Sequence, residues 1–75
     1  MKTEINQVEQ SLRKAFPTAS DIYIDHITKE CEVTVSIDDF QGELYGQLYE
    51  NGVLLKMIDY CDEYPFKYVF NYKVN

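Results

Sequence analysis

Residues 3–16 carry hydrophobic side chains every three or four positions, which is the repeat of one face of an α-helix. Thr3 can cap the N-terminus of such a helix, and Pro17 cannot continue it. The pattern therefore predicts an amphipathic helix over residues 3–16. The residues on its hydrophobic face are Ile5, Val8, Leu12, Ala15 and Phe16.

From residue 21 onward, hydrophobic residues alternate with polar ones, which is the repeat of a β-strand with one buried face. The alternation slips once after Ile24, and we expect a bulge near Asp25 or His26. Asn51-Gly52 is the preferred pair for a two-residue type I′ hairpin. The predicted strands cover residues 21–28, 31–38, 43–50, 53–58 and 66–74.

Residues 43–50 leave an alternative open, because Leu44 and Leu48 are four positions apart and also suit a short helix. Gly46 in the middle of this segment favours the strand. With Asn51-Gly52 as the turn, Glu50 then faces Val53 and the pairing continues outward. One face of the hairpin, suited to burial under the helix, carries Leu44, Gly46, Leu48, Leu55 and Met57. The other face stays exposed unless residues 66–74 fold over it, and it carries Tyr45, Gln47, Tyr49, Leu54, Lys56 and Ile58.

A chain of 75 residues is long enough for one domain and too short for a two-domain enzyme or a nucleotide-binding α/β domain. Its hydrophobic fraction of 45% and charged fraction of 27% are those of a globular chain. We expect a single domain over residues 1–75 of the α+β class, in which one N-terminal amphipathic helix packs on an antiparallel sheet of four to five strands.

The charge of the chain is negative and concentrated in its middle. The net charge is −6, and residues 30–63 hold nine of the 13 acidic residues but only one base, Lys56. Such a surface repels nucleic acid and anionic lipid and attracts a basic protein. The alternative is that the acidic residues only keep a small protein soluble.

The expected compartment of the protein decides the expected oxidation state of its cysteines. No stretch approaches the roughly 18 apolar residues of a membrane span, and residues 1–6 lack the apolar core of a secretory signal. We therefore expect a cytoplasmic protein in which Cys31 and Cys61 are reduced, one of them in the core. A disulfide between them is the alternative for an exported protein. Their spacing does not suit zinc.

Catalytic and metal-binding chemistry finds little support in the sequence. Cys31 is expected to point inward, so the single histidine, His26, has no accessible thiol to activate as a nucleophile. Asp38 and Asp39 are adjacent and point to opposite faces of an extended chain, so they cannot act as a pair of catalytic carboxylates. The acidic segment 59–63 lacks the ligand spacing and the central glycine of a calcium loop, although a weak calcium site is an alternative. We expect no enzyme activity, no metal and no cofactor.

The order of the helix, the step Phe16-Pro17-Thr18-Ala19 and the segment 48–55 resembles the PepSY-like modules, including the group similar to beta-lactamase-inhibitor protein. The resemblance covers residues 8–58. It implies a helix lying on an antiparallel sheet and a non-enzymatic binding or inhibitory role. This chain differs from those modules in ending with an additional aromatic strand.

Tyrosines interspersed with carboxylates are typical of protein-binding surfaces, because tyrosine offers contact area and carboxylates pair with arginine or lysine. We expect an acidic protein-binding module that inhibits a basic, nucleic-acid-handling protein, as a phage or mobile-element counter-defence protein of the anti-CRISPR type would. The alternative is a homodimer formed through this surface or through an edge strand at 66–74. The expected partner-binding residues are Asp38, Asp39, Glu43, Tyr45, Tyr49, Glu50, Leu54, Ile58, Asp59, Tyr60, Asp62 and Glu63.

Overall fold

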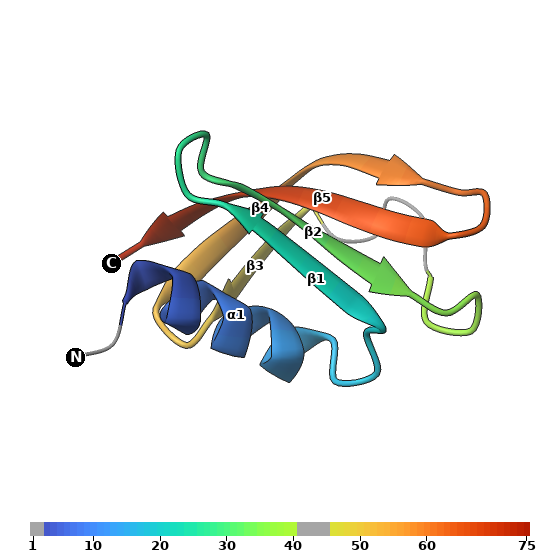
Figure 1. The fold of residues 1–75 in the computed structure, drawn as a ribbon, viewed down its shortest axis with the longest axis horizontal. Coiled ribbons are helices and arrows are strands. Elements are labelled where there is room, and N and C mark those ends of the chain that lie inside the picture. Colours follow the sequence, from blue (N-terminus) through green and yellow to red (C-terminus); the bar gives the residue numbers. More distant parts are fainter. Residues whose placement is uncertain (1–2, 41–45) are drawn as a thin grey trace.

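One helix packs on one face of a five-stranded antiparallel sheet (Figure 1). This computed structural model describes residues 3–40 and 46–75. The α+β class, the single N-terminal helix and the antiparallel sheet are confirmed. The elements are α1 (Glu4–Ala15), β1 (Asp21–Asp25), β2 (Glu30–Val35), β3 (Gln47–Glu50), β4 (Val53–Cys61) and β5 (Phe66–Val74).

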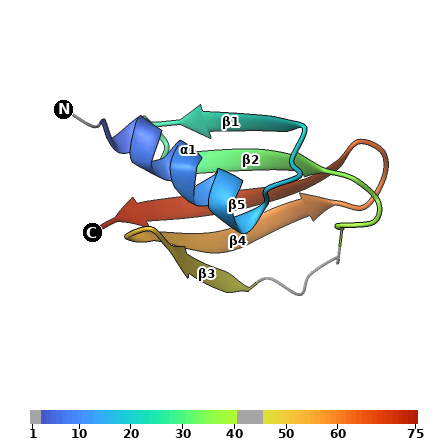
Figure 2. The ribbon, with the colours of Figure 1, turned by 90° about the horizontal axis from the view of Figure 1, so that it is seen from below.

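The last strand of the chain lies at the centre of the sheet. The strand order is β1-β2-β5-β4-β3, and Figure 2 shows α1 lying across the sheet with β1 and β3 on its two sides. The prediction that residues 66–74 form an edge strand is therefore wrong. Tyr68, Phe70 and Tyr72 are all buried in β5. A strand with so much apolar surface gains the most from neighbours on both sides.

The helix agrees with its prediction to within one residue at each end. The hydroxyl of Thr3 accepts a hydrogen bond from the backbone N–H of Asn6 (3.1 Å), as an N-cap does. At the other end, the N–H of Phe16 donates to the carbonyl of Leu12 (2.7 Å). Val8 and Leu12 are fully buried against the sheet.

The core forms between the hydrophobic face of α1 and the inner face of the three central strands. The ring of Phe16 lies against those of Tyr68 (5.7 Å between centroids) and Phe70 (5.9 Å), which joins the end of the helix to β5. The buried hydrophobic residues are Val8, Leu12, Phe16, Cys31, Val33, Val35, Val53, Leu55, Tyr68, Phe70 and Tyr72.

Strand β1 is shorter than predicted because a turn follows it at once. A carboxylate oxygen of Asp25 accepts hydrogen bonds from the N–H groups of Ile27 (3.0 Å) and Thr28 (3.3 Å). Ile27 is 81% exposed in this turn, and Lys29 takes a φ of 60°. The slip in the alternation therefore marks the end of a strand. The expected bulge near Asp25 or His26 is absent from the register of β1 with β2, which runs without a shift.

The β3–β4 hairpin has the predicted register, with Glu50 opposite Val53 and Gln47 opposite Lys56. Asn51 and Gly52 take φ values of 53° and 77°, as a type I′ turn requires. The side-chain amide of Gln7 donates to the carbonyl of Asn51 (3.0 Å), so the turn is attached to α1. The strand alternative is confirmed for residues 47–50, while residues 43–45 lie outside the described part of the chain.

The two cysteines are free and differ in environment. Cys31 is 1% exposed in β2, whereas Cys61 is exposed at the end of β4. Burial raises the pKa of the Cys31 thiol to about 12, so this side chain is protonated at neutral pH. The expectation that one cysteine belongs to the core is confirmed, and the disulfide alternative does not apply.

The stability of the fold should fall at alkaline pH because of Cys31. A raised pKa in the folded state leaves stability unchanged below the pKa of the unfolded thiol, near 9.0, and lowers it above that value. We expect the free energy of unfolding to fall by about 2 kcal/mol between about pH 9 and 10.5, measured by urea denaturation. Cys31→Ala should make this decline smaller and Cys61→Ala should not. An identical decline in both variants would contradict the assignment.

Replacing Tyr72 with phenylalanine should stabilise the fold. Its buried hydroxyl finds no hydrogen-bond partner among the described residues. Removing an unsatisfied buried hydroxyl while keeping the ring should raise the free energy of unfolding by about 1 kcal/mol. Tyr49→Phe is the matched control, because that exposed hydroxyl accepts a hydrogen bond from the Asn75 side chain (2.8 Å). A loss of stability in Tyr72→Phe would mean that its hydroxyl is bonded in solution.

Candidate partner-binding surface

Two acidic segments that are far apart in the sequence meet at one end of the sheet. Phe66, the first residue of β5, pairs with the last residue of β2, Val35, and Lys67 pairs with the last residue of β4, Cys61. The loop after β2 and the β4–β5 connection therefore leave the sheet side by side (Figure 1). We call residues 36–40 and 59–65 the acidic end. Its carboxylates are those of Asp38, Asp39, Asp59, Asp62 and Glu63.

Phe40 attaches the loop after β2 to the sheet. Its ring lies 5.2 Å from those of Phe66 and Tyr68 and 6.0 Å from that of Tyr60, measured between centroids. These contacts hold the loop against the part of β5 that α1 does not cover. The apolar anchor fixes where the neighbouring carboxylates lie.

A bulge in β4 brings Tyr60 into this aromatic group. The register of β4 with β5 shifts between Met57 and Asp59, which places Asp59 opposite Val69 and Tyr60 opposite Tyr68. Without the shift, strict alternation would place Tyr60 on the face away from the helix. The predicted strand 53–58 therefore extends to Cys61, and the ring of Tyr60, which is 38% exposed, packs against that of Phe40.

Asp39 joins two loops. Its carboxylate accepts hydrogen bonds from the hydroxyls of Thr18 and Ser36, and its N–H donates to the carbonyl of Ser36 (3.1 Å). Thr18 follows the helix, so this carboxylate holds the turn after α1 against the loop after β2. Asp39 is half-buried and already bonded, whereas its neighbour Asp38 is exposed.

Two exposed apolar side chains stand among the carboxylates of the acidic end. Ile37 is 68% exposed and Tyr64 is 89% exposed. Neither is among the partner-binding residues predicted from the sequence. Ile37 lies beyond β2, because the strand predicted to reach residue 38 ends at Val35. The sequence signal for Tyr64 is its place directly after Asp62 and Glu63, because tyrosines among carboxylates are typical of protein-binding surfaces.

The other predicted binding residues do not join the acidic end. Tyr49 and Leu54 form a cross-strand pair on the face of the sheet opposite α1, whereas Glu50 forms an ion pair with Lys14 of the helix (3.7 Å). Ile58 is half-exposed at the bulge. Glu43 and Tyr45 lie outside the described residues. The single predicted surface thus divides into separate regions.

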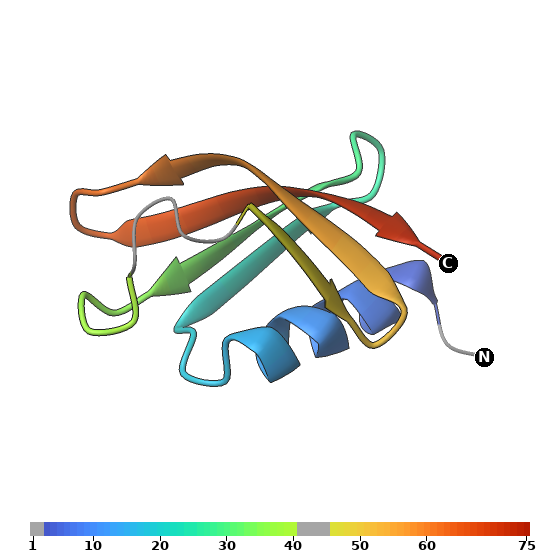
Figure 3. The same ribbon diagram turned by 180° about the vertical axis from the view of Figure 1, so that it is seen from behind.

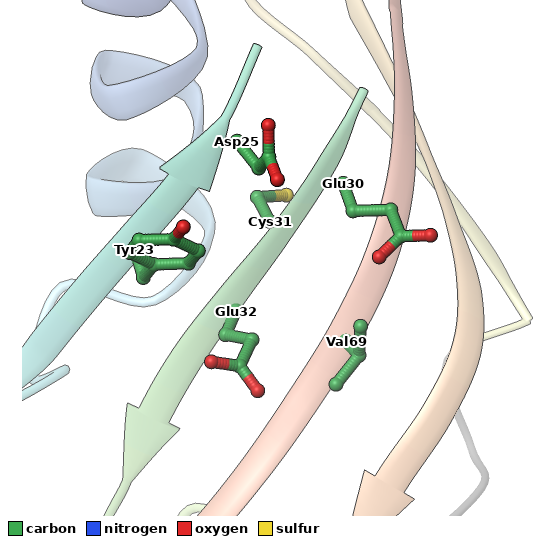
Figure 4. Close-up of a pocket in the computed structure, with 6 residues that line it drawn as sticks. All are labelled: Tyr23, Asp25, Glu30, Cys31, Glu32 and Val69. Carbon is green, nitrogen blue, oxygen red and sulfur yellow. The ribbon is translucent and has the colours of Figure 1, made fainter. Parts of the chain in front are cut away.

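A shallow hollow of about 240 Å³ lies on the face of the sheet opposite α1. One of the residues that line it is Asp25. The backbone N–H groups that donate hydrogen bonds to Asp25 lower the pKa of its carboxyl group, which keeps it ionised. Within residues 3–40 and 46–75, no three acidic, histidine or cysteine side chains are arranged to hold a metal ion. An acidic hollow of this kind suits a cationic side chain. Figure 4 shows its lining residues, Tyr23 and Asp25 on β1, Glu30, Cys31 and Glu32 on β2, and Val69 on β5.

The groups considered for catalysis lie in different environments. His26 is exposed in the turn between β1 and β2, and Cys31 is buried as a protonated thiol. A protonated, inaccessible thiol is not a nucleophile at neutral pH.

Comparisons of the chain with protein-family models, with curated proteins and with solved structures found no match. The resemblance to PepSY-like modules therefore stays a prediction. In the described part of the chain, no helix has the length and apolar character needed to cross a membrane.

Asp39 should matter for stability and Asp38 should not. Asp39→Ala removes the acceptor of two hydroxyls, and we expect it to lower the free energy of unfolding by about 1–2 kcal/mol. Asp38→Ala is the matched control, for which a change below about 0.5 kcal/mol is expected. Urea denaturation of both variants measures the difference. Equal effects would show that the contacts of Asp39 contribute nothing in solution.

Proposed function

We propose that this protein is a non-enzymatic binding module that attaches to a basic protein through its acidic end. The observation that carries the proposal is the exposure of Ile37 and Tyr64 between carboxylates that come from two loops. Apolar anchors surrounded by charged groups are typical of the centre and rim of protein interfaces.

Three exposed carboxylates of the acidic end, those of Asp38, Asp62 and Glu63, are available to a partner. Of the ion pairs among the described residues, none uses Asp38, Asp62 or Glu63. Arginine and lysine side chains of a partner can pair with them, and the net charge of −6 would speed the encounter at low salt.

A basic surface that handles nucleic acid is the partner class that this chemistry fits best. Such a surface binds phosphate groups through arginine and lysine, and carboxylates can occupy the same positions. Tyr64 would then lie where a base or an apolar contact is made. The protein would act as a competitive inhibitor of nucleic-acid binding, in the cytoplasm, as a counter-defence protein does.

Affinity capture from a lysate of the source cells, followed by titration calorimetry with the captured protein, tests this proposal. We expect the wild-type chain to retain one basic protein at about 50 mM salt and to lose most of it at about 500 mM. The double variant Ile37→Ala with Tyr64→Ala should weaken binding by about 100-fold, because two central apolar anchors are lost.

The matched control is Ile27→Ala with Tyr49→Ala, which removes one exposed isoleucine and one exposed tyrosine that lie outside the acidic end. This control should bind within about threefold of the wild type. Loss of binding in the control and retention in the Ile37/Tyr64 variant would assign the partner to a surface outside the acidic end. An affinity for the captured protein that its nucleic acid does not reduce would exclude competitive inhibition.

A further inference from the structure

The face of the sheet opposite α1, which we call the open face, is not covered by any described element (Figures 1 and 3). The residues on it follow from the register, because directly paired residues of neighbouring strands point the same way. One row across β1, β2, β5 and β4 consists of Asp25, Glu30, Asn71 and Lys56. The next row, in the same strand order, consists of Tyr23, Glu32, Val69 and Asp59.

Charges of opposite sign are separated on the open face. The β1–β2 half carries Asp21, Asp25, Glu30 and Glu32, and the β5–β4 half carries Lys56, Lys67 and Lys73. Asp59 of β4 is a further carboxylate among the lysines. None of the ion pairs among the described residues joins these groups.

The register also leaves this charge pattern unfavourable within one chain. Asp25 lies directly opposite Glu30, and like charges at directly opposed positions destabilise a sheet. Glu32 lies opposite Val69, and Lys73 lies opposite Leu54, so their direct partners on β5 and β4 provide no opposite charge. An external surface of the complementary pattern would relieve this arrangement.

We propose that the open face is a two-fold symmetric interface between two copies of this chain. A two-fold axis that runs along the strands, midway between β2 and β5, places β1 of one copy over β4 of the other and β2 over β5. The row Asp25, Glu30, Asn71, Lys56 then runs in opposite directions in the two copies. Asp25 lies over Lys56 of the second copy, and the acidic half of each copy covers the basic half of the other.

The second row fits the same arrangement. Tyr23 of one copy lies over Asp59 of the second, where its hydroxyl can donate a hydrogen bond to the carboxylate. Tyr23 is 59% exposed, and Val69 is half-buried near the axis, which supplies apolar contact between the charged groups.

The size of the overlap sets the expected affinity. Strands β1 and β2 have five and six residues, so each is about 17–20 Å long, and four strands about 4.8 Å apart overlap over roughly 350 Å² per copy. The total of about 700 Å² is in the range of weak, transient interfaces. We therefore expect a weak dimer, with a Kd of roughly 100 μM, whose affinity falls as salt rises.

Two charge-reversed double variants test the interface. Glu30→Lys with Glu32→Lys makes the acidic half basic, and Lys56→Glu with Lys73→Glu makes the basic half acidic. In sedimentation equilibrium at about 50 mM salt, each variant alone should associate at least tenfold more weakly than the wild type. An equimolar mixture of the two should form a heterodimer at least as tight as the wild-type dimer.

The mixture cannot associate through net charge alone. Each substitution changes the net charge by two units. The Glu30/Glu32 variant therefore carries −2 and the Lys56/Lys73 variant −10, where the wild type carries −6, so both variants remain negative. Asp62→Lys with Glu63→Lys is the matched control, because it also carries −2 but changes only the acidic end. This control should dimerise like the wild type while losing the basic partner, which separates the two proposals.

Three results would overturn the inference. They are a wild-type chain that stays monomeric at about 1 mM and low salt, double variants that dimerise like the wild type, and a mixture that does not associate. Circular dichroism identifies any variant that fails to fold. In that case the single changes Glu32→Lys and Lys56→Glu provide the same comparison with a smaller expected effect.

Discussion

The burial of one aromatic side of β5 is the constraint on which the rest of the structure depends. Tyr68, Phe70 and Tyr72 are buried on the same side of this strand, and a helix of 12 residues covers them. Phe16 stacks on the first of these rings and fixes the end of the helix above the middle of the strand. Pairing of β2 and β4 with the two edges of β5 forms the centre of the sheet, and β1 and β3 then pair with the outer edges of β2 and β4.

The limited length of α1 explains both surfaces discussed above. The helix covers the inner side of the sheet but not the beginning of β5, and Phe40 from the loop after β2 covers Phe66 there. That contact holds the loop after β2 at the acidic end, and it thereby fixes the position of the carboxylates that the loop carries. Because a single helix can cover only one side, no described element covers the open face (Figure 3).

The two surfaces would act together if both proposals hold. Asp38, Asp62 and Glu63 lie in the loops that follow β2 and β4, beyond the open face, so dimerisation leaves these carboxylates accessible. A dimer would present two acidic ends. Two linked sites can bind a multimeric or repetitive partner far more tightly than one site of the same chemistry.

The sequence by itself determined the features that depend on near neighbours in the chain. The helix follows from a period of three to four with a cap at Thr3, the strands follow from a period of two, and the register of the β3–β4 hairpin follows from Asn51-Gly52. These signals are local, since each depends on dihedral angles or side-chain directions within a few residues.

Tertiary structure alone decided the strand order, the central place of β5 and the composition of the candidate site. The bulge in β4 is defined only against the partner strand β5, and it moves Tyr60 to the buried side. Ile37 and Tyr64 come together with the acidic loops because β2 and β4 end beside the start of β5. The pairing of β2 with β5 joins residues 31 to 41 positions apart, and no periodic pattern in the sequence specifies which strands become neighbours.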